Sequence, residues 1–183
     1  MAQSGGSVPP SCTLDGSWSA VSVGGGAVLS QFAGGGWAVP ETLLVDGQGY
    51  ARNSGTPAIR VITQGDCNTS HTIRVSSQNG GLRRTGGAAS GFLAVRSMQY
   101  TAQWHQSQNG SAGGANMGPN VTLTTSGTPG QSVVGTYTVS GSLPAPGDNR
   151  RFDLRMQLNP APGSQVMMAG EYADVVTITL SVL

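Results

Sequence analysis

Apolar and polar residues alternate over the last part of the chain, Gly170 to Leu183, which reads GEYADVVTITLSVL. Thr177, Thr179 and Ser181 share one parity, and the opposite parity is apolar apart from Asp174. Successive side chains of a strand point to opposite faces, so this pattern predicts a strand with one apolar side and one hydroxyl side. The apolar positions are Tyr172, Val176, Ile178, Leu180 and Val182. Because the alternation continues to the last residue, we expect this strand to be packed and to need a neighbour on both edges.

Similar alternation recurs at short spacing along the rest of the chain. The segments with this pattern run over 18–23, 27–32, 58–77, 92–106, 121–124, 133–141 and 151–158. Gly, Pro, Asn and Asp separate them, and no window carries a sustained helical period. A series of about eight to nine short strands joined in this way predicts an all-β fold, an antiparallel β-sandwich.

Three features of the chain carry specific expectations about its organisation. Gly65-Asp66 predicts a turn between two strands within 58–77, in a connection that carries Cys67. Residues 92–106 form the longest expected strand, and the glycine-rich stretch from Ser107 to Asn120 predicts a long loop. No shift in composition marks a second domain. We therefore expect a short N-terminal segment, residues 1–11, and one β-sandwich domain, residues 12–183.

The composition narrows the classes of function. Of 183 residues 29 are glycine and 9% are charged, but 37% are hydrophobic and lie in alternating runs, which favours a folded, loop-rich protein. The formal net charge of +1 gives no reason to expect a nucleic acid partner. The nine basic residues are all arginine, so chemistry that depends on lysine is excluded. No apolar run reaches the roughly 18 residues that a membrane span needs, and none is expected.

Cys12 and Cys67 are the two cysteines of the chain. A pair in a low-charge, all-β chain favours a disulfide over a metal site, because a metal site needs more ligands. Closing this loop would stabilise the fold by about 4 kcal/mol in the chain-entropy treatment. A disulfide points to secretion, yet residues 1–11 have neither the basic nor the apolar region of a signal peptide. The protein is therefore either not secreted or shown in its mature form, and the cysteines favour the mature form.

No motif in the sequence supports catalysis. His71 and His105 lie on expected strands without a metal ligand at a familiar spacing, so we expect them at the surface or on an edge strand. The GxSxG elbow, the glycine-rich phosphate loops and the HExxH pair are all missing from the sequence. We expect no enzyme activity, no cofactor and no metal. Trp37 and Trp104 are candidate ligand contacts, although a tryptophan in a sandwich more often belongs to the core.

Several segments together resemble a known family. The first is Cys12, and the second is CNTSHTIRVSSQNGGL, from Cys67 to Leu82. The third is the last strand, GEYADVVTITLSVL, and the stretch YTAQW from Tyr100 to Trp104 adds to them. These segments are similar to the spore coat protein U domain, a family that includes the pilins of archaic chaperone–usher pathways. The matching segments make up a minor part of the chain.

The resemblance implies an immunoglobulin-like sandwich that lacks its last strand. A periplasmic chaperone first adds a strand, and the next subunit then replaces it during assembly at an outer-membrane usher. The protein would then be a secreted, structural or adhesive subunit of a bacterial surface fibre, a pilus or fimbria, that serves attachment and biofilm formation. Its partners would be other fibre subunits. Tyr172, Val176, Ile178, Leu180 and Val182 would border the gap in the sandwich.

The N-terminal segment departs from this family. Its pilins carry an alternating apolar donor segment before the first cysteine, whereas residues 1–11 hold Val8 as their single large aliphatic side chain. The subunit then only accepts a strand, as at a fibre tip, or its donor lies elsewhere, for example in 20–32, or the sandwich is complete. Two other functions stay open on the sequence: a monomeric sandwich that binds a carbohydrate or a surface, and a phage- or capsid-type assembly protein.

Overall fold

The structure is a computed structural model that describes residues 9–23, 30–31, 36–39, 41–52, 59–105, 116–138, 150–159 and 165–183. Within these ranges the chain forms β-strands and a single short helix, α1 (Glu41–Leu44). The strands of the named sheets pair antiparallel throughout, which confirms the predicted all-β, sandwich-like fold. None of the described helical residues form a segment that is long and apolar enough to cross a membrane.

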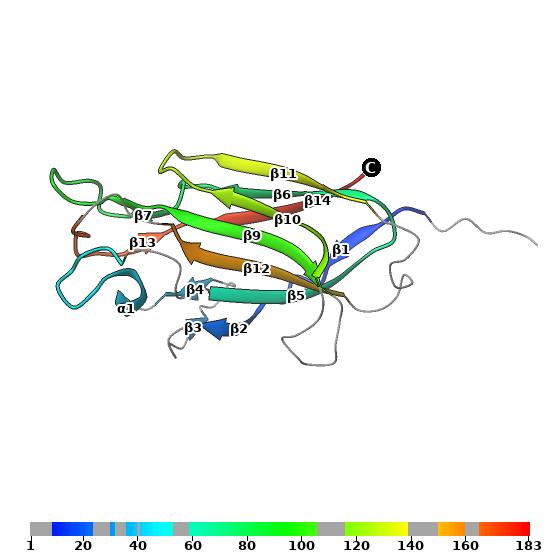
Figure 1. The fold of residues 1–183 in the computed structure, drawn as a ribbon, viewed down its shortest axis with the longest axis horizontal. Coiled ribbons are helices and arrows are strands. Elements are labelled where there is room, and N and C mark those ends of the chain that lie inside the picture. The colour runs from blue at the N-terminus through cyan, green and yellow to red at the C-terminus, as the bar shows by residue number, and fades with distance from the viewer. Residues whose placement is uncertain are drawn as a thin grey trace, which may run out of the picture.

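The larger sheet is built on three long central strands (Figure 1). Its order is β1-β5-β12-β9-β10, and β2 also pairs with β5. The strands are β1 (Cys12–Leu14), β2 (Ser19–Val23), β5 (Ile59–Cys67), β9 (Met98–His105), β10 (Asn116–Thr124) and β12 (Arg150–Leu158). β1 and β2 pair with successive parts of the same edge of β5. Two short strands therefore cover the edge that one long strand would otherwise cover.

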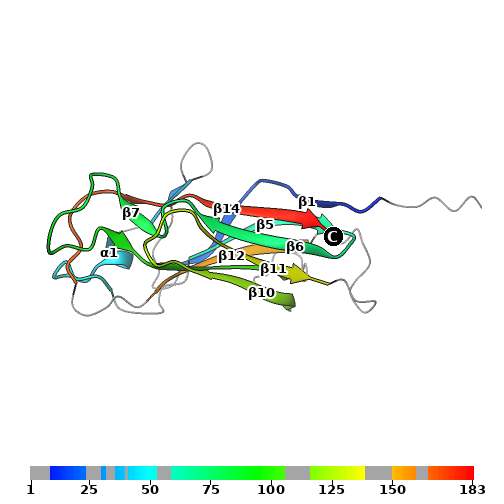
Figure 2. The same cartoon turned by 90° about the horizontal axis from the view of Figure 1, so that it is seen from above.

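The second layer is a three-stranded sheet with the order β11-β6-β14, and Figure 2 shows it lying over the larger sheet. Its strands are β11 (Gln131–Tyr137), β6 (His71–Ser77) and β14 (Val176–Val182). Two smaller sheets complete the described strands. They combine β13 (Tyr172–Ala173), β7 (Leu82–Arg84) and β8 (Val95–Arg96), and β3 (Ser30–Gln31) with β4 (Trp37–Ala38).

The core lies between the two layers, where every second residue of the long strands points inward. Burial alternates along β5, β6 and β9, as expected for strands covered on one face. The aromatic centre of the core is Trp104, whose ring meets Phe152 edge-to-face with centroids 4.8 Å apart. Ile73, Val75 and Tyr100 are also fully buried. The strands of both layers are therefore held by one continuous apolar cluster.

Gly65-Asp66 is not a turn, contrary to the sequence prediction. Both residues lie inside β5, which continues to Cys67. Gly65 pairs with Leu14 of β1, and a Cβ at Gly65 would collide with the Thr13 carbonyl oxygen and lie 2.8 Å from a Leu14 methyl group. The glycine at position 65 therefore permits the close approach of β1, and the chain turns only after Cys67.

The predicted boundaries around β9 and β10 were also wrong in part. Phe92 is nearly half exposed in a turn, and the expected long strand divides into β8 and β9 at Ser97. The expected loop from Ser107 to Asn120 ends earlier, because β10 already begins at Asn116. A bulge between Met117 and Val121 hides this part of the strand from a pattern search. Gly118 has a φ of 82°, and Tyr137 packs where its side chain would lie.

The two histidines are buried, which corrects the expectation of surface or edge positions. His71 has no exposed surface, and His105 is 6% exposed. His71 starts the central strand of the second sheet, and His105 ends β9 on the outer face of the larger sheet. Both rings have polar partners, which is how a buried imidazole is tolerated in a sandwich.

Candidate functional site: the edge of strand β14

β14 pairs with a strand on only one of its edges in the described part of the chain. Its partner is β6, with Ile178 opposite Val75 and Leu180 opposite Ile73. β6 in turn pairs with β11, which makes β14 the outer strand of this sheet. The other edge of β14 faces β1 of the larger sheet, which contacts it without a shared ladder (Figure 2).

The hydrogen-bond register decides which backbone groups of β14 point to that second edge. Gln78 N donates to Val175 O over 2.9 Å, and Leu183 N donates to Ser70 O over 3.1 Å. Antiparallel pairs alternate between bonded and non-bonded, so the odd-numbered residues of β14 bond to β6. The N–H and C=O groups that point to the second edge belong to Val176, Ile178, Leu180 and Val182. This edge therefore offers a complete half-ladder to a further strand.

The inward side chains of β14 are less covered than those of the strand beside it. Ile73 and Val75 of β6 have no exposed surface, whereas Val176, Ile178 and Leu180 pack against the core but stay partly accessible. At the end of the strand Val182 is 42% exposed. The difference follows from position, because a strand with one neighbour has its side chains covered from one side only. A second neighbour would bury these aliphatic groups.

Asp174 fixes β14 to the rest of the fold. Its Oδ2 accepts hydrogen bonds from Ser77 Oγ and Tyr100 OH, both at 2.6 Å. Its Oδ1 accepts from the backbone N–H groups of Asn79 and Val175, both at 2.9 Å. The polar break in the strand pattern is thus a carboxylate with four donors. It ties the start of β14 to the end of β6 and to β9 in the facing sheet.

The same network organises the turn that follows β6. Ser77 Oγ accepts from the N–H groups of Gly80 and Gly81, at 2.9 and 3.1 Å, while its hydroxyl donates to Asp174. Burial raises the pKa of Tyr100 far above its usual range, and the hydrogen bond to Asp174 and the charge of that carboxylate add to the rise. Tyr100 is therefore a neutral donor at any physiological pH, which keeps the Asp174 carboxylate paired.

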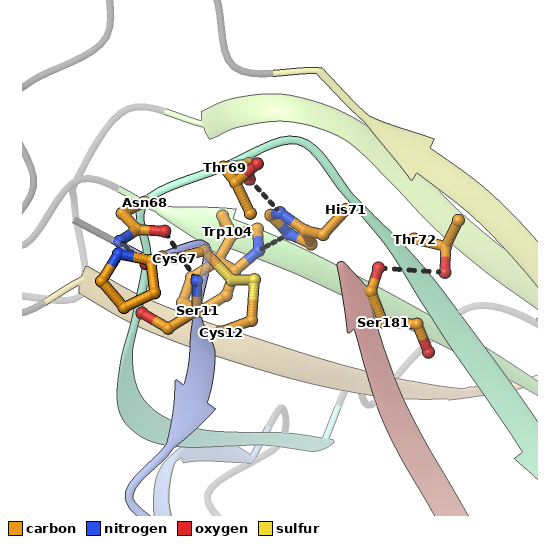
Figure 3. Close-up of a disulfide and its surroundings, with 10 residues drawn as sticks. Ser11, Cys12, Cys67, Asn68, Thr69, His71, Thr72, Trp104 and Ser181 are labelled. Atoms are coloured by element: carbon orange, nitrogen blue, oxygen red, sulfur yellow. Dashed lines mark hydrogen bonds between the residues drawn. A yellow bond between two sulfur atoms is a disulfide. The ribbon is translucent and has the colours of Figure 1, made fainter. Parts of the chain in front are cut away.

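Cys12 and Cys67 form a disulfide, which confirms the sequence prediction. They are directly opposite each other in the β1–β5 ladder, with their Cα atoms 4.2 Å apart. Figure 3 shows the bond beneath the start of β6, close to Ser181 of β14. Asn68 holds the residues before Cys12 by accepting from Ser11 N over 2.8 Å and donating to Pro9 O over 2.9 Å. The disulfide therefore anchors β1, the strand that faces the free edge of β14.

His71 is the polar centre of this end of the core. Its Nε2 lies 2.9 Å from the Nε1 of Trp104, and its Nδ1 lies 2.9 Å from the Thr69 carbonyl oxygen (Figure 3). An indole N–H can only donate, so Nε2 accepts and the ring proton sits on Nδ1. The imidazole is therefore neutral. It also stacks on Tyr137, with centroids 4.9 Å apart.

The disulfide and His71 form the one potential metal-binding group found among the described residues. The two sulfur atoms and a ring nitrogen lie within 4.8 Å of one another. Both sulfurs are bonded to each other, and both His71 nitrogens have hydrogen-bond partners. A metal needs thiolates and a free imidazole lone pair, so this arrangement serves packing in its oxidised state.

The other residues singled out in the sequence lie in different places. Tyr172 belongs to β13, not β14, and its hydroxyl lies 3.0 Å from the carbonyl oxygens of both Leu93 and Met168, which share its one proton. Trp104 is 1% exposed, so no ligand reaches it, and Trp37 is half-buried against the core. The sequence reasoning missed the anchoring role of Asp174. Its signal was present, since a lone carboxylate on an apolar strand face requires buried donors.

Comparison with family models, curated proteins and solved structures gives no match for this chain.

Proposed function

We propose that this protein is a structural subunit of a bacterial surface fibre, assembled by β-strand complementation and serving attachment. The observation that supports the proposal is the second edge of β14, where a half-ladder of backbone groups coincides with partly covered aliphatic side chains. An incoming strand would form hydrogen bonds with these backbone groups and bury these aliphatic side chains. The resemblance of the last strand to chaperone–usher pilins points to the same edge.

The composition of β14 favours an edge made for pairing. Edges that must stay single are usually protected by charged residues, proline or bulges. Val176–Val182 reads VTITLSV, with no charge and no proline, and its register with β6 is regular throughout. Asp174 holds the start of β14 against β6, and the disulfide holds β1, the strand beside β14, against β5. A preorganised edge lowers the entropy cost of adding a strand.

The incoming strand would be supplied by another polypeptide: first a periplasmic chaperone, then a neighbouring subunit. Residues 20–23, part of one candidate donor segment within this chain, already lie in β2 and pair with β5. Pro9 to Ser11 are held beside the disulfide by Asn68. Of residues 1–11, Val8 is the single large aliphatic, so this stretch is a poor match for several alternate pockets.

Amide hydrogen exchange tests the proposal residue by residue. In the isolated protein the amides of Val176, Ile178 and Leu180 should exchange rapidly, whereas those of Thr177 and Thr179 should be protected by β6. After addition of an alternating apolar strand peptide, the first set should become protected by at least about tenfold, as a new ladder requires. Unchanged exchange at this edge, with any peptide or partner subunit tried, would overturn the proposal.

A pair of charge substitutions separates the edge from the outer face. Ile178→Asp places a carboxylate on the inward side of β14, and Thr179→Asp places one on the exposed side of the same strand. We expect the first to abolish capture of the strand peptide and incorporation into fibres seen by negative-stain microscopy. The second should retain both. Equal behaviour of the two variants, with both folded by circular dichroism, would argue against strand addition.

A further inference from the structure

The two outer faces of the sandwich carry different chemistry. The outer face of the second sheet is mainly hydroxyl: its cross-strand rows are Ser132–Ser76–Thr177, Val134–Arg74–Thr179 and Thr136–Thr72–Ser181. The outer face of the larger sheet carries amides and charges instead. Its central rows are Arg60–Arg155–Thr101–Thr122 and Ile62–Asp153–Gln103. Three of the nine arginines of the chain, Arg60, Arg151 and Arg155, lie on this face.

Asp153 is the buried centre of this charged face. Its carboxylate is 3% exposed and forms an ion pair with Arg60 from β5. Arg151 Nε donates to Asp153 Oδ1 over 2.7 Å, and His105 Nε2 lies 3.0 Å from Oδ2. One carboxylate thus serves two guanidinium groups and an imidazole from three adjacent strands. It forms no ion pair with the next cation along the face among the described residues.

That next cation is Arg155, which is exposed. It lies two residues along β12 from Asp153, on the same outer face, and directly opposite Arg60 in the β5 ladder. Like charges in directly opposed positions destabilise a sheet, and of these two arginines Arg60 has an ion pair with Asp153. Among the described residues Arg155 has no ion pair, and the side chain of Arg60 is 20% exposed. The pair is therefore placed to receive a negative group from outside the protein.

We propose that this face binds a polysaccharide that carries carboxylate groups, such as a polyuronate, with its carboxylate between Arg155 and Arg60. Guanidinium groups bind carboxylates through charge-assisted, often bidentate hydrogen bonds. The neighbouring groups are Thr101, Gln103, Gln99 and Thr122, which offer amide and hydroxyl donors and acceptors for sugar hydroxyls. They lie across adjacent strands about 4.8 Å apart, a spacing that lets an extended chain contact several of them.

The neutral polar side chains around Arg155 favour a sugar acid over an acidic peptide. One exposed arginine and one partly exposed arginine stand among neutral polar side chains. A uronate chain likewise combines each carboxylate with several hydroxyl groups. A polyglutamate also carries a carboxylate at every residue but has no hydroxyl groups for the neutral Thr and Gln side chains around Arg155. The inference does not depend on strand complementation, because Arg155 lies on the opposite layer from β14.

Titration of the full chain with oligogalacturonate at low ionic strength tests this inference. Arg155→Glu reverses the charge at the proposed contact, and Arg74→Glu is the matched control, an equally exposed arginine on the hydroxyl face. We expect Arg155→Glu to weaken binding by at least about tenfold, the effect of losing one charge-assisted contact, and Arg74→Glu by less than about twofold. Binding should also weaken as salt rises to about 0.15 M, because the contact is partly exposed.

Several outcomes would overturn the inference. Binding that both variants weaken equally would be non-specific attraction to positive charge. Equal binding of neutral dextran would mean that the carboxylate is not recognised, and equal or tighter binding of polyglutamate would assign the face to acidic peptides. No binding of oligogalacturonate at millimolar concentration would also refute it. Unchanged thermal unfolding of both variants confirms that they are folded, and Ile178→Asp should bind the oligosaccharide normally.

Discussion

β11 and β14 flank the same central strand, β6, but they differ in how closely the facing sheet packs against them. In the row at Ile73, β11 contributes Gly135 and β14 contributes Leu180. A Cβ at Gly135 would collide with the side chain of Val121 from β10. The larger sheet therefore closes over β11, and only glycine fits between the layers there. At the other end of the row a large aliphatic side chain remains partly exposed.

The two outer strands of this sheet therefore differ in what lies beside them in the other layer, β10 beside β11 and the short β1 beside β14. β10 packs against both β11 and β6, although it shares no ladder with either among the described residues. On the β14 side, β1 is short and is fastened to β5 by the disulfide, and within the described ranges no strand forms a ladder with the second edge of β14. Inward side chains are partly covered on both strands, and the clearest difference lies at their ends, where Tyr137 of β11 is buried and Val182 of β14 is exposed. This difference is one reason for the proposal that β14 receives a partner strand.

The largest expected effect comes from the disulfide, which anchors the β14 side alone. Replacing both cysteines by alanine should lower the free energy of unfolding by about 4 kcal/mol for a bridge of 55 residues. The measurement is denaturant unfolding of the oxidised protein and the double variant. Exchange in the double variant should rise first in β1 and at the end of β14, and not at Gly135. A uniform rise across both sides would mean that the two sides are not independent.

Asp174→Asn is expected to have the next largest effect, again on the β14 side. The asparagine oxygen can still accept from Asn79 N and Val175 N, but its NH₂ group cannot accept from Ser77 and Tyr100. Two buried hydroxyls lose their acceptor, at a cost of roughly 3 kcal/mol in unfolding free energy. Urea unfolding measures the loss.

Asp15→Asn is the control for Asp174→Asn, because it removes a carboxylate at an exposed position. It should leave the free energy of unfolding unchanged within about 0.5 kcal/mol. An equally small effect of Asp174→Asn would show that the carboxylate does not anchor the strand.

Gly135→Ala tests the closed side. The added methyl group must displace Val121, so we expect a loss of about 2 kcal/mol from overpacking. Leu180→Val, in the same row on β14, should cost less than about 1 kcal/mol, because this side chain is only partly buried. Thermal or urea unfolding of both variants gives the comparison. Similar losses would mean that the two edges are packed alike, contrary to the structure.

The sequence revealed the strands and the disulfide because both depend on local signals. Alternation located β5, β6, β12 and β14 closely, since each has one face in the core. It failed where tertiary contacts set the residue choice. Gly65 and Gly118 read as turn residues, but they are strand positions against which β1 and Tyr137 pack. The histidines looked like surface residues because their partners, Trp104 and Asp153, are distant in the sequence.

From the sequence, only the apolar face of the last strand could be predicted, and not its position at the edge of a sheet. Alternation in the last strand identified Val176, Ile178, Leu180 and Val182 as one face, and the structure places all four in β14. That the strand has a single partner depends on where β1 and β10 lie, which no local pattern encodes. The break at Asp174 separates Tyr172 into β13, so the predicted continuous strand is two.

The smallest expected effect is a pH dependence that links the Asp174 anchor to β9. The folded-state pKa of Tyr100 is raised by burial and by Asp174, so its proton stays bound in the folded protein while the unfolded chain releases it near pH 10. The stability from this group is therefore complete below pH 10 and is lost as the pH rises above it. Between pH 8 and 10.5 the wild type should lose about 1 kcal/mol more than Tyr100→Phe, which has no proton to release. Parallel losses in the two proteins, measured by urea unfolding across this range, would show that Tyr100 is free to ionise and that the hydroxyl does not hold β14 to the facing sheet.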